Sequence, residues 1–173
     1  MHSKRHRILT IVMSAILMLI VVSCGKKDEG KLVYHHFEEI GSEGWDPADV
    51  ISFEPWPADS ATAKEHSYRV ELMLRSSARQ DIQEIPLAVV TEDESGIISK
   101  DTFLLTPYGT ARFEVKNQES FGIREQSVIL KNDLTLTDGY AVNISPLADQ
   151  RSTEGLLNVG IRLYQLPVET NDK

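Results

Sequence analysis

The chain has 173 residues, with 18 Lys and Arg against 26 Asp and Glu and a formal net charge of −8. This length favours one domain, and 7% aromatic with 25% charged residues is ordinary for a globular protein. The acidic balance disfavours binding to nucleic-acid phosphates and offers no basic patch for an anionic bilayer.

The N-terminal segment has the three-part pattern of an export signal. Residues 2–7 are basic, and residues 8–22 form an apolar run shorter than the roughly 20 residues that span a bilayer. The run ends in Val21-Val22-Ser23-Cys24-Gly25, which resembles a lipobox with an aliphatic residue at −3 and a small residue at −1. We therefore expect residues 1–23 to be a lipoprotein signal peptide and Cys24 to be lipid-modified.

Cys24 is the only cysteine of the chain. A lone exposed thiol is a liability in an oxidising compartment, and acylation removes it. The signal contains three cations and no acid, so its removal takes the net charge from −8 to −11. The mature protein would then depend on its covalent lipid for membrane attachment. The alternative is a short membrane anchor in which the cysteine is incidental.

Residues 24–31 are polar and rich in charge, which is typical of a flexible tether. The residue directly after Cys24 is Gly25. Many proteobacterial lipoproteins that stay in the inner membrane have Asp at this position, so outer-membrane sorting is expected by analogy. The triplet Lys27, Asp28 and Glu29 is similar to the Lys and two acids that some Bacteroidetes use as a surface-export signal.

Residues 32–167 contain segments that alternate between apolar and polar positions with a period of two, separated by turn residues, which predicts a β domain followed by a polar tail at 168–173. About eight short strands predict an all-β, antiparallel sandwich, with an up-and-down barrel as the alternative. The segments expected as strands are 32–40, 50–54, 68–75, 85–91, 97–105, 110–116, 133–137, 140–145 and 155–163, with 127–130 pairing at an edge.

The predicted connections follow turn chemistry. A hairpin loop over 92–96 joins two strands, and Asp138-Gly139 predicts a tight hairpin between 133–137 and 140–145. We expect 58–66 to be a loop with a helical turn at most, and 117–126 to be irregular.

Several stretches together resemble a known family. The run GWDPADVISF at residues 44–53 looks like a stretch near the start of the gliding-motility lipoprotein H (GldH) family of Bacteroidetes. The features in common around it are a lipobox, a strand with Tyr34 and Phe37, a Leu-x-Leu-Arg strand end at Arg75, Ile85-Pro86-Leu87, Gly139-Tyr140, and Val159-Gly160-Ile161-Arg162.

This resemblance implies a lipoprotein of the gliding and secretion machinery that is not an enzyme and has envelope protein partners. Related proteins also occur in bacteria that do not glide. The resemblance favours a periplasm-facing position on the outer membrane over surface exposure.

The residue pattern predicts no metal, cofactor or catalytic site. His35 and His36 are neighbours on a strand and point to opposite faces, so they cannot chelate one metal, and His66 stands alone. The acids of residues 92–94 fit a solvated hairpin, and those near residue 47 fit a turn. An envelope hydrolase is the alternative, with a catalytic triad whose residues come together only in the folded protein.

Trp45 and Trp56 are the only tryptophans and are candidate interaction residues. Exposed rings would stack on sugars or a partner, which makes a glycan-binding surface lipoprotein the other alternative. We expect Trp45 to be buried and leave Trp56 open. Ser60, in Asp59-Ser60-Ala61, is similar to the O-glycosylation site of Bacteroidetes proteins and is a candidate for modification.

Overall fold

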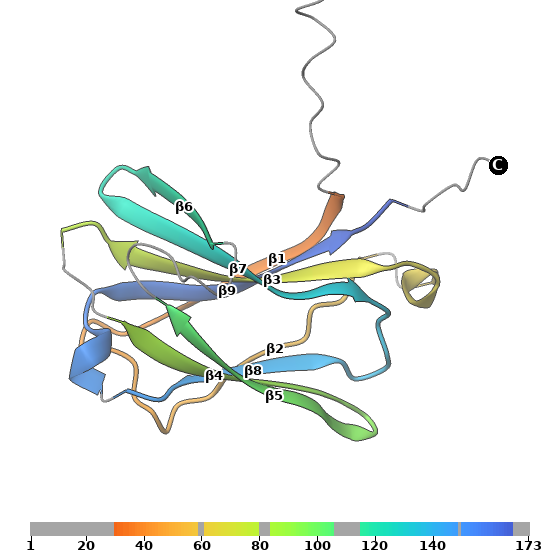
Figure 1. Ribbon diagram of the computed structural model, residues 1–173, viewed down its shortest axis with the longest axis horizontal. Coiled ribbons are helices and arrows are strands. Elements are labelled where there is room, and N and C mark those ends of the chain that lie inside the picture. The colour runs from red at the N-terminus through yellow and green to blue at the C-terminus, as the bar shows by residue number, and fades with distance from the viewer. Residues whose placement is uncertain (1–29, 59–60, 80–83, 106–114, 149, 168–173) are drawn as a thin grey trace, which may run out of the picture.

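The computed structural model describes residues 30–58, 61–79, 84–105, 115–148 and 150–167. Within them the chain forms nine β-strands and two short 3₁₀ turns, Ala63–Glu65 and Gln150–Thr153. The strands make two antiparallel sheets packed face to face (Figure 1), so the predicted all-β sandwich is confirmed. None of the helical segments described here is long and apolar enough to cross a membrane.

The larger sheet has five strands in the order β1-β9-β3-β7-β6. Their bounds are β1 Lys31–Glu39, β9 Leu156–Gln165, β3 Tyr68–Ser77, β7 Ile123–Leu134 and β6 Val115–Ser120. The smaller sheet has the order β2-β8-β4-β5, with β2 Ile51–Phe53, β8 Ala141–Pro146, β4 Ile85–Asp93 and β5 Gly96–Leu105.

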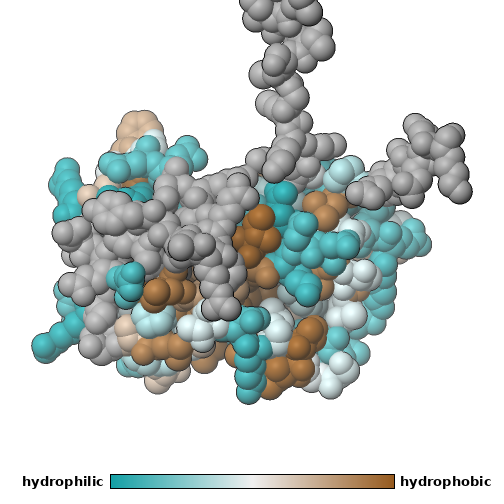
Figure 2. Space-filling model, viewed as in Figure 1, coloured by the Kyte–Doolittle hydropathy of each residue, from teal (hydrophilic) through white to brown (hydrophobic). Residues whose placement is uncertain are grey.

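The core lies between the sheets and follows the alternation seen in the sequence. On β3, Val70, Leu72 and Leu74 are at most 2% exposed and belong to one cluster with Leu87 and Val89 of β4. The intervening β3 side chains point to the outer face of the five-stranded sheet. In Figure 2, the side of the molecule turned to the viewer has apolar surface near its middle and polar surface toward its ends.

The expectation that residues 117–126 are irregular is wrong. This region contains most of β6, a two-residue turn and the start of β7. The polar sequence of the edge strand β6 hides the alternation that marks a half-buried strand. The expected edge position of 127–130 is also wrong, because β7 lies between β3 and β6.

The expected hairpin around Asp138-Gly139 is wrong as well. β7 ends at Leu134 in one sheet and β8 begins at Ala141 in the other, so the chain crosses the sandwich here. The turn itself is present, since Tyr140 N donates to Thr137 O at 3.2 Å and Gly139 has φ +69°. Asp-Gly thus marked the turn correctly, but a local dipeptide does not determine which sheet receives the next strand.

The other predicted strands that lie within the described residues are present, with boundaries shifted by a few residues. The predicted strand 110–116 lies mostly outside the described residues, and its last two positions belong to β6. The helical turn allowed within 58–66 is the 3₁₀ turn Ala63–Glu65.

Candidate functional site: the outer face of the five-stranded sheet

Four strands of the larger sheet bring charged and aromatic side chains together on its outer face. We call this the outer-face cluster, and it consists of His35 and Phe37 on β1, Arg162 on β9, Arg75 on β3 and Glu125 on β7. The register places His35 opposite Arg162 and Arg75 opposite Glu125. Residues far apart in the sequence therefore meet only because β1, β9, β3 and β7 are neighbours in this order.

Glu125 is the centre of the ionic contacts. Its Oε2 lies 2.9 Å from Arg75 Nε, and its Oε1 accepts a hydrogen bond from Arg162 Nη2. Burial by itself would raise the pKa of Glu125, but the hydrogen bonds and charges of the two arginines hold that pKa below its usual value. The side chains of Glu125 and Arg162 are about one-fifth exposed, so water screens the ionic triad of Glu125, Arg75 and Arg162 only partly.

The aromatic part of the cluster lies beside this ionic triad. The Arg75 guanidinium carbon is 3.8 Å from the centroid of the Phe37 ring, in cation–π range. The His35 ring meets Phe37 edge-on, with centroids 5.0 Å apart. Burial lowers the pKa of His35, and the charges of Arg162 and Arg75 lower it further, so this imidazole is neutral at neutral pH.

The outer face next to the cluster is also well packed. Met73 on β3 is fully buried although its side chain belongs to the outer face. Glu71 on the same face is 3% exposed and lies 3.0 Å from Arg69 Nε, whose guanidinium carbon sits 4.7 Å from the centroid of the Tyr164 ring. The face is thus a packed layer of arginine, carboxylate and ring side chains rather than a row of freely moving charges.

The chemistry of the outer-face cluster favours recognition of a protein surface. Two arginines against one carboxylate and a neutral imidazole leave a local charge of +1 on an otherwise acidic protein. Arginine and aromatic side chains held in place by packing lose little entropy on binding, and both are enriched at interface centres.

The two tryptophans lie elsewhere. Trp45 is 3% exposed, as expected from the sequence, and its backbone N and ring Nε1 donate to Thr153 Oγ1 at 2.6 Å and Asp49 O at 2.9 Å. Trp56 is partly buried and packs against the core. A buried Trp45 ring cannot stack on a sugar, so Trp56 alone keeps some free ring surface for such a role.

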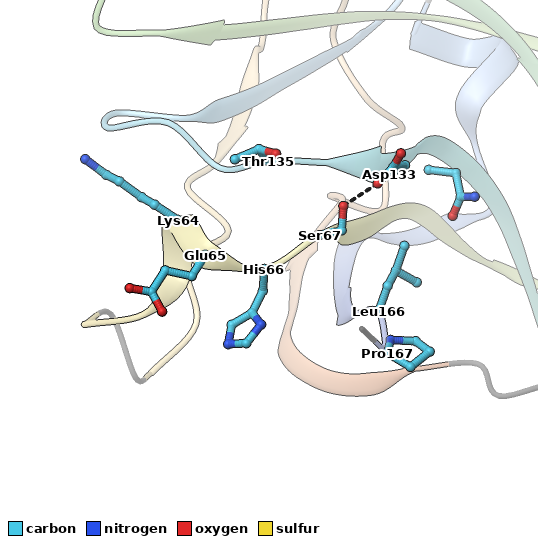
Figure 3. A pocket seen from close by; sticks show the side chains of 9 residues that line it. Lys64, Glu65, His66, Ser67, Asp133, Thr135, Leu166 and Pro167 are labelled. Atoms are coloured by element: carbon cyan, nitrogen blue, oxygen red, sulfur yellow. Dashed lines mark hydrogen bonds between the residues drawn. The ribbon is translucent and has the colours of Figure 1, made fainter. Parts of the chain in front are cut away.

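A cavity of about 630 Å³ opens where β9 ends and β3 begins (Figure 3). It contains His66, Ser67 and Asp133, the residue types of a hydrolytic triad. However, Ser67 Oγ donates directly to Asp133 Oδ1, and the His66 ring points away from this pair. A triad needs the imidazole between the hydroxyl and the carboxylate, so these three residues are not arranged as one.

The acids expected in turns do lie in turns, and the remaining candidate sites lie outside the described residues. Asp46 Oδ1 accepts from Ala48 N in a turn, and Asp93 is bonded to Ser95 and Thr137 at the β4–β5 hairpin. Cys24, the Lys27-Asp28-Glu29 triplet and Ser60 lie outside the described residues. Within the described ranges, no three His, Cys, Asp or Glu side chains gather as a metal site would require.

Comparisons with known proteins do not identify a family for this chain. No family model matches it, and no curated protein matches it either. Among solved structures, Eiger TNF from S. frugiperda aligns with 12% sequence identity and a TM-score of 0.33, over 83% of this chain and 98% of that one.

Proposed function

We propose that this chain is a lipid-anchored, non-catalytic interaction component of a bacterial cell-envelope machine, similar in role to the gliding-motility lipoprotein H family. Cys24 holds the protein to the outer membrane, and the sandwich domain binds envelope protein partners. The observation that carries the proposal is the convergence of Phe37, Arg75, Glu125 and Arg162 on one outer sheet face.

The positions of these residues in the sequence also support a shared partner surface. Phe37, Arg75 and Arg162 belong to three separate stretches that resemble the family, and Gly160 from the last stretch lies under Phe37. Their side chains face away from the core, so filling the core does not account for them. A shared partner surface explains why residues of this type come from β1, β3 and β9 to one place.

The partner surface should be acidic at its centre. Arg75 keeps about one-third of its side chain exposed while its other face covers Phe37. A partner carboxylate that reached Arg75 would face a planar guanidinium whose position is already fixed. Because the rest of the mature chain is strongly acidic, such a partner would be repelled from most of the remaining surface.

The proposal is tested by co-purification from crosslinked native envelopes with the full-length chain. We expect wild type to recover a defined set of envelope proteins, and the Arg75→Gln, Arg162→Gln double variant to recover them about tenfold less. Arg79→Gln is the matched control, because Arg79 is an exposed arginine outside the outer-face cluster. Equal recovery by the double variant and wild type, with both folded, would exclude this face as the partner surface.

The orientation of the domain is tested separately by protease treatment of intact cells. We propose that the domain faces the periplasm, so protease should cut it only after the outer membrane is permeabilised. Cleavage on intact cells would instead favour surface export. In that case Asp28→Ala with Glu29→Ala should protect the chain again, because the export signal would be lost.

A further inference from the structure

The β6–β7 turn places an aromatic ring entirely in solvent. Ser120 pairs with Ile123, so the loop consists of Phe121 and Gly122 alone. Their φ angles are +52° and +77°, which is the backbone of a type I′ hairpin turn. The relative exposure of Phe121 is 103%, the largest among the exposed large hydrophobic residues of the described chain.

The fold gives no reason for phenylalanine at this position, on two separate grounds. A side chain with a Cβ is strained in the left-handed region, where Asn, Asp and Gly are preferred. The exposed ring also leaves all of its apolar area in water, so it contributes nothing to the hydrophobic stability of the fold. A strained residue whose ring adds nothing to the stability of the fold points to a function outside the domain.

The turn is held firmly in place. Gly122 O accepts a hydrogen bond from Ala78 N at 2.9 Å, which ties the tip to the end of β3. Ile123 is 40% exposed and extends the apolar surface next to the ring. The tip appears as an apolar projection at the upper left of Figure 2, where Figure 1 shows the β6–β7 hairpin. A ring presented on a fixed turn pays little ordering entropy when it is bound.

The turn also lies at the end of the sandwich opposite the start of β1. Lys31 pairs with Gln165, and Gln165 pairs with Tyr68 at the start of β3. Ser77 at the other end of β3 pairs with Ile123 beside the turn. The ten residues of β3 separate the two ends by roughly 30 Å. If Cys24 anchors the chain, the turn therefore lies at the end of the domain away from the point where the tether joins it.

We propose that Phe121 is the anchor residue of an interface with a second envelope protein, which receives the ring in an apolar pocket. This inference rests on the proposed function and assigns the outer end of the domain a contact distinct from the outer-face cluster. Gly122 allows the tight turn that projects the ring into solvent, and Ile123 contacts the rim of the partner's pocket.

A membrane and a second copy of the chain are poorer binding partners for the Phe121 ring. Even a myristoyl chain gives only marginal bilayer binding, and one phenyl ring buries less apolar area than that chain. In another copy, the cavity at the β3 start is lined mainly by polar residues, including the charged Lys64 and Glu65, which do not suit a phenyl ring. Contacts between that end and the tip would also be head-to-tail, which gives rings or open filaments rather than a two-fold dimer.

The test uses the full-length chain in its native cells, with Phe121→p-benzoylphenylalanine as a photo-crosslinker. We expect one protein adduct, with the linkage mapped by mass spectrometry to apolar residues of that partner. Ile97→p-benzoylphenylalanine is the matched control, because Ile97 is an apolar residue that is 56% exposed on the β4–β5 hairpin. The control should give no adduct with the same protein.

A second variant separates binding from folding. Phe121→Asn suits the left-handed turn and should not lower the melting temperature, yet it should reduce recovery of the crosslinked partner about tenfold or more. Ile97→Asn should leave that recovery unchanged. An adduct with lipid, an adduct with another copy of the chain, no adduct at all, or full recovery by Phe121→Asn would each overturn the inference.

The two proposals fail in distinguishable ways. If wild type recovers no envelope protein under any crosslinking condition, the proposed function is wrong. If wild type recovers partners and Phe121→Asn recovers them equally, only the role of Phe121 is wrong.

Discussion

Phe37 on β1 lies directly over Gly160 on β9, and the fit leaves no space for a side chain at position 160. A Cβ built on Gly160 would come 2.6 Å from the backbone oxygen of His36 and closer still to the Phe37 ring. The ring therefore covers the glycine across the strand pair, and the Arg75 guanidinium lies over the ring.

Gly160→Ala should lower the free energy of unfolding by about 1–3 kcal/mol, because the edge strand β1 must move to accept the methyl group. Gly41→Ala is the control, since nothing lies within 4 Å of a Cβ at position 41. Chemical denaturation measures both variants. Equal stability of Gly160→Ala and wild type would show that β1 does not pack on β9 as described.

Leu72→Ala tests the core between the sheets. Leu72 is 1% exposed on β3, so its truncation should cost about 2–5 kcal/mol through lost burial and the cavity left behind. Ile97→Ala, at an exposed position, should change stability by less than about 0.5 kcal/mol. A loss below that same value for Leu72→Ala would place the residue outside the core.

Much of this fold follows from local sequence, and the outer-face cluster does not. The strand 68–75 was predictable because its apolar residues fill one face without interruption. Most of β6 was missed because residues 116–120 are all polar and the turn that follows uses Phe121 instead of a turn former. The meeting of Phe37 with Arg75 depends on β9 lying between β1 and β3, which no local pattern encodes.

Glu125→Gln tests the ionic centre of the outer-face cluster. Removing the charge leaves Arg75 and Arg162 partly buried without their carboxylate, which should cost about 1–2 kcal/mol at neutral pH. The native pKa of Glu125 is depressed, so wild type should lose this contribution as pH falls from about 4.5 through the native pKa. The variant should lack that part of the acid transition, whereas Glu119→Gln, an exposed control, should retain it.

His35 should titrate below its usual value. Because its native pKa is lowered from 6.5, the unfolded chain binds the proton first as pH falls. Stability tied to neutral His35 is therefore complete above pH 6.5 and declines as pH falls toward the native pKa. An NMR titration of the imidazole in the folded protein measures this directly, and a midpoint above 6.5 would contradict the packing of His35 beside Arg162 and Arg75.

The attachment of the chain to the membrane through Cys24 is the claim on which the proposed role depends. Its most direct measurement is the intact mass and N-terminal peptide of the mature protein from native membranes, together with metabolic labelling by an alkyne fatty acid. We predict that the mature chain starts at a lipid-bearing Cys24, and that Cys24→Ala loses the label and leaves the membrane fraction. A mature chain that retains residues 1–23, or a Cys24→Ala variant whose domain stays membrane-bound after washing, would contradict the account.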